Sequence, residues 1–89
     1  MNTKDLANEL VNSCANYPGV VDPDCIKETL EKEFSGEVVP DGITDHCFRR
    51  VCLAVFHQLN KQVISPRDVL PHHMYNTIYN VLRTHINVA

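Results

Sequence analysis

The histidines and cysteines are the residues best suited to chemistry, so a metal site is the first possibility to weigh. Structural zinc needs four converging Cys or His ligands, usually in close pairs such as C-x2-C. The four cysteines are far apart: Cys14, Cys25, Cys47 and Cys52. In the stretch SPRDVLPHHMYN, residues 65–76, His72 and His73 are consecutive and so point in different directions on a helix. The sequence therefore predicts no metal and no other cofactor.

Thiol catalysis is the second possibility, because Asp45, His46 and Cys47 are the three residue types of a catalytic triad. A nucleophile needs its base within hydrogen-bond reach, and successive residues of a helix do not face each other. The chain also lacks a glycine-rich phosphate loop and a G-x-S-x-G elbow. We predict that the protein is not an enzyme and has no catalytic residues.

Binding to DNA is the most specific alternative. Two helices over residues 44–61 and 72–87 could form a helix-turn-helix, and a polar stripe on the second would read bases through His72, Asn76, Asn80, Arg83 and Asn87. Asn and Arg are the side chains that recognise adenine and guanine edges. An acidic pI of about 5.9, few cations and a turn without glycine count against this interpretation.

Binding to protein is the hypothesis that the residues favour. Tyr75 and Tyr79 are four positions apart, with Arg83 one turn further along and Phe48 of the preceding helix as a candidate neighbour. Tyr and Arg are enriched in interface hot spots. Tyrosines at the edge of a core are also common without any partner.

We add Arg49 and Arg50 to the predicted partner-binding residues as an electrostatic contribution. The protein is then a non-catalytic interaction module, either a small adaptor or an inhibitor of the type that viruses and mobile elements encode. In a second version of this prediction the partner is another copy of the chain. A domain this small gains buried area by forming a homodimer.

Charge is divided unevenly along the chain. Residues 1–42 hold nine acids against three lysines, and residues 43–89 hold two acids against five cations, which together give the net charge of −3. Every arginine and histidine lies in the second part. The simpler interpretation is that the two parts neutralise each other in the fold. The alternative is a bipolar surface that docks on an acidic partner or on another copy.

Composition indicates an ordinary globular domain, because 44% of the 89 residues are apolar and 21% are charged. The N-terminus, MNTKDLANEL, has the wrong pattern for a signal peptide, and the apolar run VCLAVF, residues 51–56, is far shorter than the ~20 residues that span a bilayer. We expect one domain over residues 1–89, no membrane partner, and free thiols in a reducing compartment such as the cytoplasm.

Apolar residues recur at helical spacing through most of the chain, which predicts an all-α fold. We expect a small bundle of about four helices plus a short helical turn, over residues 4–16, 23–35, 44–61, 65–70 and 72–87. The expected start signals are Asn2 or Thr3, Asp22 followed by Pro23, and Thr44. Gly36 is the expected stop of the second helix.

The third predicted helix is expected to be central, because VCLAVF is apolar around its whole circumference. Asp45 and Arg49 form a favourable pair at its start. Pro71 suits the first position of the last helix, so the histidines of SPRDVLPHHMYN are explained as a helix start before any ligand site is invoked.

Overall fold

Four helices surround one apolar core in the computed structural model, which describes residues 1–14, 22–62 and 71–89. They are α1 (Thr3–Ser13), α2 (Pro23–Phe34), α3 (Asp45–Gln62) and α4 (Pro71–His85). The predicted all-α bundle is confirmed. Asn16, where the first helix was expected to end, and the predicted turn at residues 65–70 lie outside the described residues.

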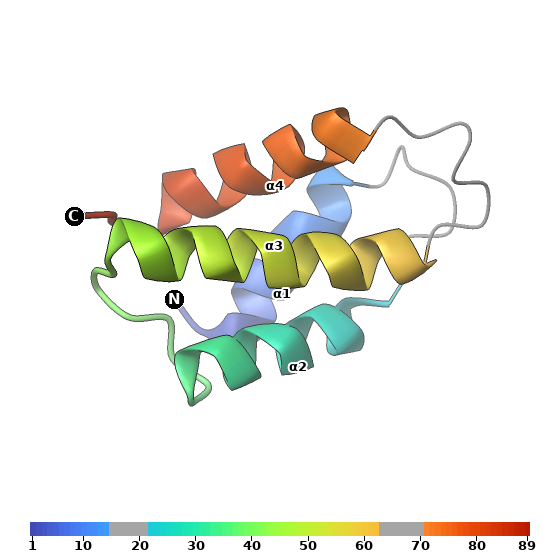
Figure 1. Ribbon diagram of the computed structural model, residues 1–89. Helices are drawn as coiled ribbons and strands as arrows, with labels where there is room; N and C mark the ends of the chain where they lie inside the picture. The colour runs from blue at the N-terminus through green and yellow to red at the C-terminus, as the bar shows by residue number, and fades with distance from the viewer. Residues whose placement is uncertain (15–21, 63–70) are drawn as a thin grey trace.

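The helices form a ring in which each packs against two neighbours. α1 packs on α2 and α4, and α3 packs on the same two helices (Figure 1). The pair α3 and α4 therefore forms one side of the bundle, and the pair α1 and α2 forms the opposite side. No helix in the described ranges is long and apolar enough to cross a membrane.

Side-chain caps start three of the helices where the sequence predicts them. Each cap is an oxygen that accepts a hydrogen bond from a backbone N–H of the first turn, at 2.8 to 3.1 Å: Asn2 for α1, Asp22 for α2 and Thr44 for α3. Pro23 occupies the first position of α2. These caps satisfy N–H groups that have no partner within the helix.

The end of α2 differs from the expected stop. Ser35, and not Gly36, takes the left-handed conformation there, with φ 57° and ψ 36°. The backbone N–H of Gly36 then donates to the carbonyl of Glu31 at 3.0 Å. A left-handed conformation costs a residue with a Cβ about 1 kcal/mol, which the closing hydrogen bond of the helix end offsets in part.

The predicted apolar stripes form the core. On α1, α2 and α4, and at the residues that directly follow α1 and α4, the fully or almost fully buried members are Leu6, Leu10, Cys14, Ile26, Leu30, Met74, Ile78, Leu82 and Ile86. Val11, Phe34 and Val81 complete these stripes as partly buried residues packed against the core. The helical spacing of the sequence was therefore enough to identify the buried side of three helices.

The expectation for the third helix is wrong in one respect. α3 forms one side of the ring, so one of its own faces meets solvent, and Leu53 in the middle of VCLAVF is 49% exposed. Val51, Cys52 and Val55 are fully buried. At 3.6 residues per turn, Leu53 projects away from the line that these side chains form.

Both ends of the described chain meet the connector between α2 and α3 at one end of the bundle (Figure 1). Asn2 pairs with Val38 in an antiparallel bridge, and Ile43 pairs with Val88 in a parallel one. α4 ends at His85, two residues before the predicted end, because residues 87–89 run extended alongside Ile43 and exchange backbone hydrogen bonds of 2.9 Å with it.

Candidate functional site

The seam between α3 and α4 is built from two matched aromatic pairs. The two helices run side by side in opposite directions (Figure 1). The ring of Phe48 meets that of Tyr79 edge-on, with centroids 5.2 Å apart, and Phe56 meets Tyr75 at 6.0 Å. Each edge-to-face pair contributes about 1 kcal/mol beyond its buried area. The tyrosines are therefore fixed by α3 while remaining partly exposed.

Arg83 extends this seam by one turn of α4. Its guanidinium carbon lies 5.9 Å from the centroid of the Phe48 ring. Among the described residues, Arg83 takes part in none of the ion pairs. The aromatic contact orients the guanidinium, and its N–H donors are left open to a partner's carboxylate.

Arg49 and Leu53 continue the same surface on α3. The pKa of the Tyr75 hydroxyl is raised, first by burial, with further contributions from Cys52 and Tyr79, whereas Arg49 acts to lower it. The guanidinium of Arg49 is itself paired with Asp45 at 2.9 Å. Leu53 follows Arg49 by one turn and is half exposed. We call the surface made by Arg49, Leu53, Tyr75, Tyr79 and Arg83 the α3/α4 face.

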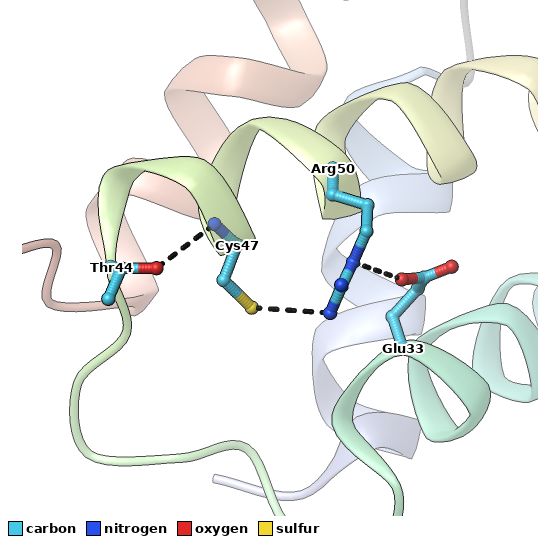
Figure 2. A network of polar contacts seen from close by, with 4 residues as sticks. All are labelled: Glu33, Thr44, Cys47 and Arg50. Carbon is cyan, nitrogen blue, oxygen red and sulfur yellow. Dashed lines mark hydrogen bonds and ion pairs between the residues drawn. The ribbon is translucent and has the colours of Figure 1, made fainter.

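Arg50 does not join this face. Its Nε donates to Glu33 Oε2 of α2 at 3.1 Å, and its Nη2 donates to Cys47 Sγ at 3.8 Å (Figure 2). The side chain thus points toward α2, on the other flank of α3. Consecutive residues of a helix project about 100° apart, which separates Arg50 from Arg49.

Cys47 lies in the first turn of α3, where its own N–H donates to Thr44 Oγ1 at 3.1 Å (Figure 2). Within the described residues, the side-chain partner of its sulfur is Arg50, which has no proton-accepting group. Asp45 is turned instead to Arg49, at 2.9 Å. Asp45 and Cys47 therefore each contact an arginine of the same helix.

All four thiols are free, and their surroundings differ. Burial raises the pKa of Cys14 and of Cys52 to about 11. The pKa of Cys25 is also raised, chiefly because its thiol donates to the carboxylate of Asp22 at 3.1 Å. The thiolate is the reactive form, so these three sites are poor nucleophiles.

We expect iodoacetamide at pH 8 to modify Cys47 first, Cys25 more slowly, and Cys14 and Cys52 only when the protein unfolds. Cys47 is half-buried and carries a cation beside its sulfur, whereas the last two are fully buried. Peptide mapping by mass spectrometry over a time course measures the order. Alkylation of Cys52 as fast as Cys47, with the helical circular dichroism intact, would contradict the packing described here.

The histidines do not gather with other ligands. In residues 1–14, 22–62 and 71–89, no three His, Cys, Asp or Glu side chains lie together as a metal set. The rings of His72 and His73 are 4.3 Å apart and nearly edge-to-face at the start of α4, and both side chains are exposed.

The residues proposed for DNA reading are all exposed, but their stripe is shorter than predicted. His72, Asn76, Asn80 and Arg83 lie on α4, whereas Asn87 falls in the extended segment after it. The turn of the predicted helix-turn-helix, residues 63–70, lies outside the described residues. The antiparallel course of the two helices (Figure 1) also differs from the steep crossing of that motif.

A hollow of about 440 Å³ lies next to the α3/α4 face, where the chain ends meet the connector. Arg83, His85 and Asp41 are among the residues that line it. Because both signs of charge are present, the hollow favours neither anions nor cations. Arg83 therefore borders both the hollow and the α3/α4 face. Of the two, only the α3/α4 face combines aromatic and apolar side chains with cations.

Comparison with family models, with curated proteins and with solved structures found no match for this chain.

Two features of α3 were not predicted from the sequence. The exposure of Leu53 was missed, although its position off the line through Phe48, Val55 and Leu59 was a usable signal. The turn of Arg50 toward Glu33 had no such signal, because these two residues are far apart in the chain and meet only through the packing of α2 on α3.

Proposed function

We propose that this protein is a non-catalytic interaction module that binds another protein through its α3/α4 face. The observation that carries the proposal is the position of Arg83, set over the Phe48 ring beside Tyr79 with no ion-pair partner among the described residues. An arginine held in place by an aromatic ring loses little entropy when it binds a carboxylate.

The remainder of the face supports this proposal. Tyr75, Tyr79 and Leu53 supply exposed or partly exposed apolar area on the same face, and Arg49, which is paired with Asp45, adds a polar group there. Aromatic and arginine anchors surrounded by apolar contacts are typical of interface hot spots. The chemistry of the face suits a partner with acidic groups beside apolar ones, as an adaptor or an inhibitor would bind.

DNA binding through α4 is the weaker proposal. Arg83 is the one lysine or arginine on α4, and a protein of net charge −3 has little with which to neutralise phosphates. Affinity for DNA that falls steeply with salt, and that Asn76→Ala weakens for a preferred sequence more than for random DNA, would favour this alternative over protein binding.

We expect Arg83→Ala to weaken binding of the protein partner by about tenfold or more, which is the lower range for a hot-spot arginine. The matched control is Lys61→Ala, which removes one exposed cation that is not part of the α3/α4 face and should leave affinity unchanged. Titration of each variant against the co-purified partner, with circular dichroism to verify folding, provides the measurement. Equal affinities for the wild type and for Arg83→Ala would remove the α3/α4 face as the binding site.

A further inference from the structure

Opposite charges are separated in the fold and are only partly neutralised. Of the three ion pairs among the described residues, Lys27–Glu31 lies within α2 and Asp45–Arg49 within α3. Only Glu33–Arg50 joins the acidic first part of the chain to the basic second part. Mutual neutralisation of the two parts is therefore limited to one ion pair among the described residues.

Exposed acids without an ion pair among the described residues lie mainly on α1 and α2, with Glu37 and Asp41 in the connector between α2 and α3. Four exposed carboxylates on these helices make no ion pair with a described residue: Asp5, Glu9, Asp24 and Glu28. Lys4 and Lys32 are the exposed cations of the same two helices, so acids outnumber them. We call this surface the α1/α2 face.

The α1/α2 face and the α3/α4 face are on opposite sides of the bundle, because the helices pack in the ring order α1, α2, α3, α4 (Figure 1). One side therefore presents unpaired carboxylates, and the other presents Arg83 without an acid partner together with the exposed apolar area of Leu53 and the tyrosines. The two surfaces are complementary in charge.

We propose that the partner of the α3/α4 face is the α1/α2 face of a second copy of this chain. This inference rests on the proposed function, since it uses the same face and names its partner. The guanidinium of Arg83 meets carboxylates of the next copy, and the tyrosines and Leu53 cover the apolar stems of its long side chains.

The arrangement joins two different surfaces, so it is head-to-tail. Each copy that binds through one face still offers the other, and association therefore continues into a chain or closes into a ring. The bundle measures 35 × 22 × 17 Å between Cα atoms, so one lateral face is of the order of the ~800 Å² that a partner contributes to a standard interface. Attraction between exposed charges also makes the association sensitive to salt.

Charge variants test this proposal because they block one face at a time. Arg83→Ala blocks the α3/α4 face, and Glu9→Lys combined with Glu28→Lys blocks the α1/α2 face. Lys61→Ala is the matched control, because it changes the net charge by the same amount as Arg83→Ala but removes an exposed cation that belongs to neither face. Circular dichroism verifies that each variant is folded.

Sedimentation equilibrium at low salt should show a wild-type mass that rises with concentration and falls on adding salt. Arg83→Ala and the double variant should each weaken association by about tenfold or more, with Lys61→Ala retaining it. Mixing the two blocked variants should give a complex that stops at two chains, because only one pair of complementary faces remains.

A wild-type protein that stays monomeric, or a dimer that neither variant weakens, would overturn head-to-tail association. The proposed function would survive the first result if Arg83→Ala still abolished binding to a foreign protein. Both proposals would fail if Arg83→Ala changed neither self-association nor foreign binding.

Discussion

Replacing Phe48 with alanine should lower the free energy of unfolding by about 3 to 5 kcal/mol, as is usual for a fully buried phenylalanine. The side chain is 0% exposed, and its ring contacts both Tyr79 and the guanidinium of Arg83. Removing it leaves a cavity under the α3/α4 face. A domain of this size is stable by only some 5 to 15 kcal/mol, so the variant should be close to unfolding at 37 °C.

Urea denaturation followed by circular dichroism measures the effect of Phe48→Ala. Phe56→Ala is the matched control, because it removes the other phenylalanine of the seam from a partly exposed position and should cost less. A loss below about 1 kcal/mol for Phe48→Ala, or a larger loss for Phe56→Ala, would show that Phe48 is not the buried anchor of the seam.

Raising the pH from 8 to 10 should destabilise the fold through its two buried thiols. The pKa values of Cys14 and Cys52 rise from an ordinary 9.0 to about 11 on folding. Between these values the unfolded chain loses thiol protons that the folded protein retains, so ionisation favours the unfolded state. The contribution of each neutral thiol to the free energy of unfolding is fully present below pH 9. It falls as the pH rises through 9 toward 11, by about 1 kcal/mol for each thiol at pH 10.

The comparison that isolates these thiols is the change in urea midpoint between pH 8 and pH 10, with and without Cys14→Ala and Cys52→Ala together. The double variant should be less stable at both values of pH, but its midpoint should depend less on pH. An equal pH dependence in the two proteins would mean that the buried thiols do not cause the alkaline loss of stability.

Much of the fold could be predicted because its determinants are local. The caps at Asn2, Asp22 and Thr44, and the proline at the start of α2, act within one helical turn. The apolar stripes of α1, α2 and α4 required only the helical period. Each of these signals is present in a short segment and does not depend on how the helices pack.

The features of the fold that could not be predicted depend on packing between segments that are distant in the sequence. The run VCLAVF predicts a buried helix but does not show which of its residues faces solvent. Leu53 is the exposed one, because the helices pack in a ring that leaves one side of α3 uncovered. The early end of α4 follows from pairing of residues 87–89 with Ile43, which no local pattern indicates.

The candidate surface was predicted in part for the same reason. Tyr75, Tyr79 and Arg83 share one side of a single helix, so their spacing identified them as one group. Their contacts with Phe48 and Phe56 depend on the antiparallel packing of α3 against α4. The separation of Arg49 from Arg50 follows from helix geometry, but the choice of Glu33 as the partner of Arg50 does not.

The measurement that tests the α3/α4 face most directly is site-specific photo-crosslinking in cells that express the protein. A photoreactive phenylalanine derivative in place of Tyr79 preserves an aromatic ring at the centre of the face, and the same derivative in place of Thr84 tests an exposed position on the same helix, away from the seam. We predict protein adducts, to a second copy or to a foreign protein, from position 79 and not from position 84, and their loss when Arg83→Ala is added. Adducts from position 84 alone, or adducts from position 79 that persist with Arg83→Ala, would contradict binding through this face.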